Sequence, residues 1–240
     1  MDQKKTDISV VIPAYNEAQR LPKTLKIISD FFALKDYKYE IIVVDDGSTD
    51  KTIEKVKGQK VKNLKVLSYK INRGKGYAVN YGVSRAGGEY IIFCDADNST
   101  PFEQIEKLLV EAKENEVVIG SRYLKDSDIK IKQSFSRQVG ARFGNLLIRI
   151  ILLSRVRDTQ CGFKMFQKLA AREIFSRQTI WRWGFDIEIL YIAKKLEFKI
   201  KEVPVEWLND TESKVQSPFV FLSTLSELFR IKFNSLKKRY

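Results

Sequence analysis

The sequence predicts an α/β fold in which a mostly parallel sheet is flanked by helices, and three observations support this prediction. Short β-branched runs, ISVVI at 8–12 and EIIVV at 40–44, are typical of strands buried on both faces of a sheet. A stretch with helical spacing of apolar residues separates the two runs. Strand and helix then keep alternating, which predicts parallel strands joined by right-handed crossovers.

Each further element follows from the same patterns. The first helix is expected to begin near Pro22, with one apolar face formed by Leu21, Leu25, Ile28 and Phe32. A second helix should follow Asp50. We expect further strands at 64–68, 90–94 and 117–120, and further helices at 76–86 and 103–114.

The alternation weakens after residue 120, where two basic segments begin to dominate the charge. The chain has 43 basic and 30 acidic residues, a net charge of +13. Segments 129–157 and 214–240 contain 13 of the basic residues and one acid, Glu227, interleaved with bulky apolar side chains. This pattern favours amphipathic helices on an anionic membrane surface. We therefore expect a catalytic domain over 1–215, with 129–157 as its basic amphipathic acceptor or membrane segment, and a basic amphipathic helix over 216–240.

Composition excludes several kinds of chemistry. The chain contains no histidine, which rules out histidine bases, Ser-His-Asp triads and histidine-ligated metals. Two cysteines are too few for a disulfide scaffold and favour a reducing compartment. The first ten residues, MDQKKTDISV, lack the apolar core of a signal peptide, and no run reaches the roughly 18 apolar residues of a membrane span. We expect a cytoplasmic protein, peripheral on the cytoplasmic face of a membrane.

Acidic residues follow three of the expected strands. Glu17 comes soon after the first strand, Asp45 and Asp46 after the second, and Asp95 and Asp97 after the strand at 90–94. The carboxyl ends of parallel strands meet at one edge of the sheet, where ligands bind. Converging like charges need a cation or a ligand, although a single acid at such a place often only caps the next helix. Asp95 and Asp97 suit Mg²⁺ or Mn²⁺, completed by substrate phosphates.

A basic loop, NRGKG at 72–76, precedes the helix expected at 76–86. The loop is placed to wrap phosphate oxygens before a helix N-terminus, although it lacks the spacing of a P-loop. An ordinary basic turn is the equally weighted alternative.

An ordered set of motifs then resembles a known family. The chain from 8 to 215 resembles family-2 glycosyltransferases of the GT-A fold, and within them the dolichyl-phosphate β-glucosyltransferase-like, polyprenyl-phosphate branch. The motifs that carry the resemblance are IPAYNE, VVDDGSTD, NRGKGYAVN, EYIIFCDADNSTP, GSRY, DTQCGFKMF, WGFDIEILY and EVPVEW. Mannosyl relatives often continue the metal motif as DADLQ, whereas this chain has Asn98 and Ser99, which favours the glucosyl-like branch.

The resemblance assigns roles to individual residues. It implies nucleotide-sugar binding by Pro13, Ala14, Tyr15, Glu17, Asp45, Asp46, Lys75, Asp95 and Ala96, and metal binding by Asp95 and Asp97. It implies catalytic roles for Asp97, Arg122, Arg137, Asp158 and Gln160, and acceptor binding by Arg122, Arg137, Lys164, Ser213 and Lys214. Plainer alternatives are a membrane-surface cation for Arg137, a helix cap for Asp158 and a core hydrogen-bonding group for Gln160. Trp183, Phe185 and Ile189 are expected in the core.

The reaction implied by this resemblance is inverting transfer of a hexose from a nucleoside diphosphate sugar to a polyprenyl or dolichyl monophosphate, with UDP-glucose favoured as donor. One alternative is transfer of mannose from GDP-mannose. Another is transfer to a glycan hydroxyl, for which Asp158 is the candidate base. A basic nucleic-acid-binding protein is the non-enzymatic rival, but the basic residues lie among apolar ones without evident stacking platforms, so no nucleic-acid partner is expected.

Overall fold

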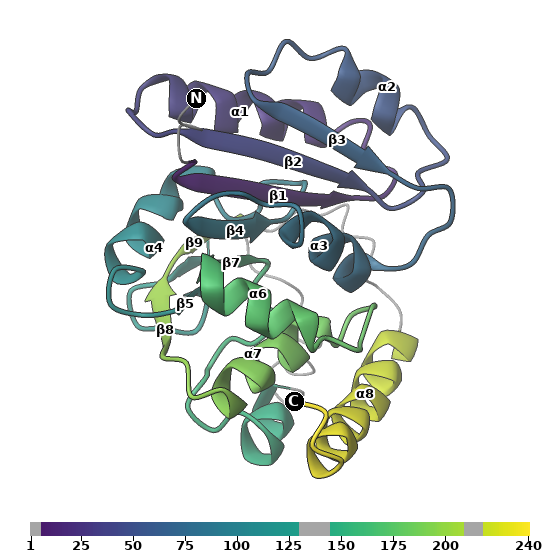
Figure 1. The fold of residues 1–240 in the computed structure, drawn as a ribbon, viewed down its shortest axis with the longest axis vertical. Coiled ribbons are helices and arrows are strands. Elements are labelled where there is room, and N and C mark those ends of the chain that lie inside the picture. The colour runs from purple at the N-terminus through teal and green to yellow at the C-terminus, as the bar shows by residue number, and fades with distance from the viewer. Residues whose placement is uncertain (1–5, 130–144, 209–217) are drawn as a thin grey trace.

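A seven-stranded sheet forms the centre of the molecule (Figure 1). The computed structural model describes residues 6–129, 145–208 and 218–240. The strand order is β3-β2-β1-β4-β7-β5-β8. The strands are β1 Ile8–Ala14, β2 Tyr39–Asp45, β3 Leu64–Ser68, β4 Tyr90–Cys94, β5 Val117–Ser121, β7 Phe163–Gln167 and β8 Ile200–Pro204. All five strands expected from the sequence are present, which confirms the α/β prediction.

The sheet is parallel except for β7, which the sequence did not predict. Strand β7 is inserted between β4 and β5 and runs antiparallel to both. Its first residue, Phe163, therefore pairs with Cys94 at the carboxyl end of β4. This reversed direction brings the segment before β7, residues 158–162, to the edge of the sheet where β1, β2 and β4 end.

Helices cover both faces of the sheet. One apolar cluster includes side chains of α3, α6 and α7, and a second includes side chains of α1 and α4 on the other face. The helices are α1 Leu21–Ala33, α2 Thr52–Lys57, α3 Lys75–Val83, α4 Ile105–Glu111, α6 Lys168–Ser176, α7 Phe185–Lys195 and α8 Pro218–Leu236. The structure also has a 3-10 turn, Phe102–Gln104, a helix over 145–151, and a two-stranded sheet of β6 Asp128–Ile129 and β9 Glu206–Trp207.

Helix α8 differs in detail from the amphipathic helix that was expected. Leu228 and Ile231 pack into the core, while Phe229, Phe233 and Leu236 are exposed. The polar side of the helix contributes to the protein interior as well, because Asn234 is buried. Within the described part of the chain, no helix is both long enough and apolar enough to cross a membrane.

Candidate active site

A cleft of about 650 Å³ lies at the carboxyl ends of β1, β2 and β4. The predicted site residues that line it are Pro13, Ala14, Tyr15, Glu17, Asp46, Lys75, Asp95, Ala96, Asp97, Arg122, Asp158 and Gln160. These residues come from six separate segments of the sequence, and the fold brings them together around one cavity.

Two predicted site residues lie away from the cleft wall. The carboxylate of Asp45 is buried and accepts a hydrogen bond from the Ser48 amide at 3.3 Å, so it holds the turn after β2. Lys164 is fully buried, and its ammonium contacts Asp186 and the carbonyl oxygen of Cys161. This placement corrects the assignment of Lys164 to the acceptor: the side chain lies behind Asp186, which lines the cleft. The assignments of Arg137, Ser213 and Lys214 lie outside the described residues.

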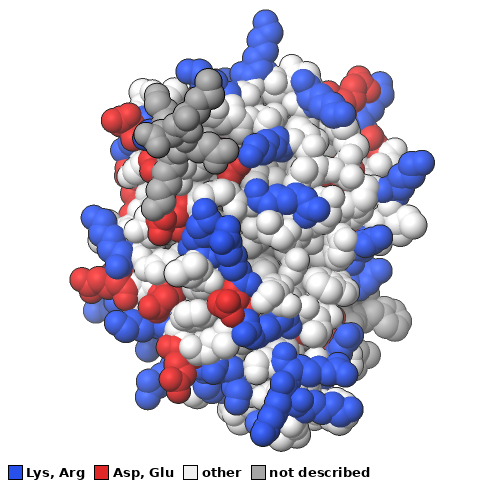
Figure 2. All heavy atoms as spheres, viewed as in Figure 1, with Lys and Arg blue, Asp and Glu red and all other residues white. Residues whose placement is uncertain are grey.

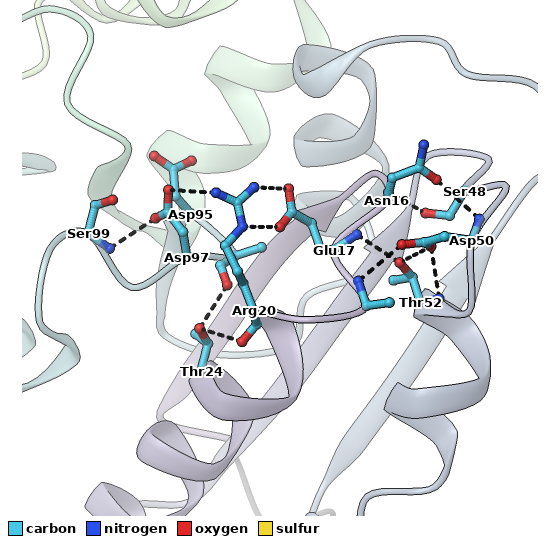
Figure 3. A network of polar contacts seen from close by, with 12 residues as sticks. Asn16, Glu17, Arg20, Thr24, Ser48, Asp50, Thr52, Asp95, Asp97 and Ser99 are labelled. Carbon is cyan, nitrogen blue, oxygen red and sulfur yellow. Dashed lines mark hydrogen bonds and ion pairs between the residues drawn. The ribbon is translucent and has the colours of Figure 1, made fainter. Parts of the chain in front are cut away.

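The loops after β1 and β2 interlock at one end of the cleft (Figure 3). The Asn16 amide donates to Ser48 Oγ at 2.9 Å, and the Thr49 amide donates to Asn16 Oδ1 at 2.8 Å. The Glu17 amide donates to Thr52 Oγ1 at 2.8 Å. Asn16 adopts the left-handed region, with φ of 55°, which asparagine tolerates better than most residues. These bonds fix the backbone that carries Tyr15 and Glu17 toward the cleft.

Asp46 organises the basic loop before α3. Its carboxylate accepts hydrogen bonds from the amides of Arg73, at 2.7 Å, and Gly74, at 2.9 Å. Asp46 thus occupies two of the backbone amides of the loop at 72–76, and contact of this loop with a phosphate stays a prediction. Gly74 has φ of 103°, and a Cβ there would lie 2.5 Å from the carbonyl oxygen of Trp181, so the position requires glycine. Lys75 remains as the cation that this loop presents to the cleft.

Asp95 and Asp97 converge as expected. The chain turns at Asn98, with φ of 53°, and the Ser99 amide donates to Asp97 Oδ1 at 2.9 Å. Asp95 forms an ion pair with Lys75 at 2.5 Å. Burial and then the neighbouring charge of Asp95 raise the pKa of Asp97 above its usual value. Two like charges in a partly buried place are stabilised by a further cation.

Arg20 is a site residue that the sequence did not predict. Its guanidinium donates to both carboxylate oxygens of Glu17, at 2.7 and 2.6 Å, and Nη1 lies 4.0 Å from Asp97 Oδ2 (Figure 3). Arg20 therefore links the acid after β1 to the acid after β4. The three-residue spacing of Glu17 and Arg20 at the start of a predicted helix was the available signal.

The acids present fit a divalent cation that is completed by its substrate. Within the described ranges, no three acidic or cysteine side chains gather as a complete metal cage. Mg²⁺ usually takes one or two protein carboxylates and obtains its other ligands from water and substrate phosphates. Asp95 and Asp97, both at the cleft wall, match that requirement.

Arg122, which is partly exposed to the cleft, forms an ion pair with the buried Asp158 at the other end of the cleft. Asp158 accepts from the Arg122 amide at 2.9 Å, from Nε at 2.7 Å and from Nη2 at 2.9 Å. Its own amide donates to Glu202 at 2.9 Å, and the Arg122 guanidinium lies 5.4 Å from the Trp207 ring centre. Burial alone would raise the pKa of Asp158, but the Arg122 charge and hydrogen bonds hold that pKa below its usual value. Arg122 therefore holds Asp158 as a buried anion, and the catalytic role that the resemblance implies for Asp158 stays a prediction.

The WGFDIEILY motif is divided between cleft and core. Phe185 and Ile189 are fully buried, as predicted. Trp183 is 38% exposed and lines the cleft, so its assignment to the core is wrong. The reason is that Gly184 ends a surface loop, and α7 begins only at Phe185. Glu188 is buried and accepts from the amide of Thr179 at 2.9 Å, which ties α7 to that loop.

Comparison with known proteins agrees with the fold and the cleft. A family model described as "Glycosyl transferase family 2" matches residues 9–175. The chain belongs to this family of glycosyltransferases.

Individual relatives show which members of the family this chain is similar to. The chain is 38% identical to a "Dolichyl-phosphate beta-glucosyltransferase" of Dictyostelium discoideum, over 95% of this chain and 75% of the relative. It is 33% identical to the Homo sapiens protein of the same name, over 98% of this chain and 78% of the relative.

Two solved structures have a similar fold. One is glucosyl-3-phosphoglycerate synthase from Mycobacterium tuberculosis in complex with Mn²⁺, UDP and glucosyl-3-phosphoglycerate, with a TM-score of 0.65 and 22% identity over 98% of this chain and 80% of that chain. The other is mannosyl-3-phosphoglycerate synthase from Rubrobacter xylanophilus, with a TM-score of 0.72 and 16% identity over 97% of this chain and 74% of that chain. At these identities the likeness shows a GT-A-like fold.

Proposed function

We propose that this glycosyltransferase moves glucose from UDP-glucose to a polyprenyl or dolichyl monophosphate, with inversion at the anomeric carbon. The names of the relatives support the sugar and the acceptor. The complex of the fold neighbour with UDP and Mn²⁺ supports a uridine nucleotide and a divalent cation, Mg²⁺ or Mn²⁺.

The observation that carries the proposal is that each carboxylate lining the cleft already has a partner. Asp158 is paired with Arg122, Asp95 with Lys75, Asp186 with Lys164, and Glu17 with Arg20. Asp46 accepts two backbone amides, and Asp97 accepts the Ser99 amide beside Arg20. A hydroxyl acceptor needs a general base to take its proton. These partnered acids instead favour an acceptor that arrives already ionised.

A phosphomonoester meets this requirement. Its second pKa is about 6, so at neutral pH it is mostly a dianion whose oxygen attacks without losing a proton. Arg122 uses Nε and Nη2 on Asp158, and Nη1 makes no hydrogen bond among the described residues, which suits it to a phosphate oxygen. Arg137, Ser213 and Lys214 are proposed to complete the acceptor side, with Gln160 at the cleft wall between acceptor and donor.

On the donor side, Asp95 and Asp97 would hold the divalent cation. That cation supplies Lewis-acid stabilisation of the charge that grows on the departing diphosphate. Lys75 adds a fixed positive charge beside Asp95, at 2.5 Å. The interlocked loops that carry Tyr15 and Glu17, together with Asp46, are proposed to form the nucleotide pocket.

A membrane-borne acceptor also agrees with the distribution of charge and apolar surface. Phe229, Phe233 and Leu236 of α8 are exposed, and the segment 214–240 that contains this helix has six basic residues and one acid. We propose that the protein binds peripherally to an anionic membrane, on its cytoplasmic face.

The test is a two-by-two assay of donors and acceptors. UDP-glucose and GDP-mannose are each offered with a short-chain polyprenyl phosphate and with the matching polyprenol, in Mg²⁺ or Mn²⁺. The expected result is transfer only from UDP-glucose to the phosphorylated lipid, with kcat/KM for the acceptor rising through the second ionisation of the phosphate, near pH 6. Equal use of the polyprenol would reject the phosphate mechanism, and preference for GDP-mannose would reject the assigned donor.

A further inference from the structure

Helix α8 lies against the loop that connects α6 with α7, residues 177–184 (Figure 1). Arg182 and Trp183 of this loop line the cleft. The loop therefore has the cleft on one side and α8 on the other.

Helix α8 holds the loop near both of its ends. The Gly184 amide donates to Glu227 Oε2 at 2.8 Å. At the other end, Asn234 Nδ2 donates to Thr179 Oγ1 at 2.9 Å, and Arg230 Nη2 donates to the Thr179 carbonyl at 3.3 Å. Asn234 is buried, so its bond is shielded from water. A buried polar bond of this kind is costly to break without a replacement.

The same loop also contacts the residues on the donor side of the cleft. The Tyr77 amide donates to the Trp181 carbonyl at 3.1 Å, within the first turn of α3. The same carbonyl lies so close to Gly74 that a Cβ there would be 2.5 Å away. The loop thus bridges α8 and the segment that presents Lys75 to the cleft, and a shift of α8 must move a wall of the site.

The outer face of α8 is apolar and flanked by cations. Phe229, Phe233 and Leu236 are 69%, 54% and 73% exposed. The Lys237 ammonium lies 4.3 Å from the centre of the Phe233 ring. Basic side chains gather at the end of the molecule where α8 lies (Figure 2); those of the helix and the residues after it are Arg230, Lys232, Lys237, Lys238 and Arg239. Apolar groups within a cationic rim are complementary to an anionic lipid surface.

We propose that α8 relays membrane binding to the cleft: its outer face seats on anionic lipid, while Glu227 and Asn234 on its inner face fix the loop that carries Arg182 and Trp183. This inference rests on the proposed function, because a lipid-borne acceptor makes the relay useful. Glu227 and Asn234 are positioning residues in this scheme. In this scheme the lipid surface binds more tightly to the protein when α8 is hydrogen-bonded to the loop than when these bonds are broken. Lipid binding therefore favours the state in which the loop is held in place.

The three tryptophans of the chain make the loop observable. Two of them, Trp181 and Trp183, lie in the loop, and Trp207 lies beside Arg122. A Trp207→Phe background restricts the emission to the loop. Phosphatidylcholine vesicles with and without phosphatidylglycerol are added, and emission and co-sedimentation are followed together. Anionic vesicles should bind the protein and shift the emission, and neutral vesicles should do neither.

Glu227→Ala is the decisive variant in this background. It should co-sediment as the parent does but lose the emission shift. In the chain with all three tryptophans, the same substitution should lower the vesicle-dependent rise in kcat by about tenfold, the effect of losing one charge-assisted hydrogen bond of about 1.4 kcal/mol. Glu227→Gln keeps an acceptor oxygen for the Gly184 amide and should restore most of both signals. Phe229→Ser should require more lipid and then give the full emission shift.

If thermal melting shows that Glu227→Ala is unfolded, Asn234→Ala is the second variant in which the emission shift is measured. An emission shift that survives in both variants overturns the relay, because the loop tryptophans then sense lipid directly. An absence of vesicle binding by the parent also overturns it. Failure of the chain with all three tryptophans to glucosylate a short-chain polyprenyl phosphate, both with and without anionic vesicles, would instead contradict the proposed function. The emission measurements do not depend on that result.

Discussion

Arg122→Ala should destabilise the protein strongly, because it leaves a buried charge without its partner. Asp158 is 1% exposed and accepts three hydrogen bonds from Arg122, two of them from the guanidinium. Removing the guanidinium leaves only the backbone amide of residue 122 in this set. Breaking a buried ion pair from one side typically costs about 3–5 kcal/mol, against a total stability of about 5–15 kcal/mol for a domain. We expect a loss of about 3 kcal/mol or more in the free energy of unfolding at pH 7.

The pH dependence of this loss has a definite sign. In the wild type the pKa of Asp158 is held below its usual value, so its stabilisation is complete above the unfolded pKa of about 3.9 and disappears as pH falls through the folded pKa. Without Arg122, burial dominates and raises that pKa. The variant then carries a penalty at neutral pH that protonation relieves. The stability difference between the two proteins should therefore shrink as pH falls from 7 toward 4.

Urea denaturation of both proteins across this pH range measures the difference directly. Arg177→Ala is the matched control, because Arg177 pairs with Glu173 on the surface at 2.6 Å. Exposed pairs of this kind contribute about 0–1 kcal/mol. A loss in Arg122→Ala no larger than that of the control, or one that does not change with pH, would refute the assignment of Asp158 as a buried structural anion.

Three further substitutions test the donor side. Asp97→Asn should weaken Mn²⁺ binding measured by electron paramagnetic resonance and lower turnover about 100-fold or more, and wild-type values for both would remove Asp97 from the metal site. Gly162→Ala would place a Cβ 1.9 Å from Asp95 Oδ2, so Asp95 must shift and turnover should fall sharply. The same overpacking should lower the free energy of unfolding by about 1–3 kcal/mol, measured by urea denaturation. Retained turnover would contradict this contact. Arg20→Lys keeps the charge but loses the two-oxygen contact with Glu17, so KM for UDP-glucose should rise about tenfold, and an unchanged KM would exclude Arg20 from donor binding.

The parallel part of the fold was predictable because its signals are local. Buried strands of an α/β sheet are β-branched runs, and β1 and β2 are such runs, extended in the structure to Ala14 and Asp45. The rule that ligands bind at the carboxyl ends of these strands then brought Asp46, Asp95 and Asp97 together. No knowledge of distant contacts was needed for this half of the site.

The remaining site residues depend on contacts that spacing does not encode. Lys164 is in a motif that the resemblance assigns to acceptor binding. In the structure its side chain is fully buried and forms an ion pair with Asp186. Trp183 has the composition of a core residue, but it lies in the surface loop that ends at Gly184. In both cases the position of the side chain depends on contacts between residues that are far apart in the sequence.

The direction of β7 explains why one cleft serves both substrates in the proposed reaction. A parallel strand in that position would carry the preceding segment to the opposite edge of the sheet. Because β7 is antiparallel, Asp158 and Gly162 arrive at the edge where β4 ends, and Gly162 packs directly against the carboxylate of Asp95. Only glycine leaves room there for the Asp95 oxygens. In the proposed reaction, this arrangement would hold the acceptor beside Arg122 and the cation beside Asp95 at a fixed distance from each other, as a transfer between two bound phosphates requires.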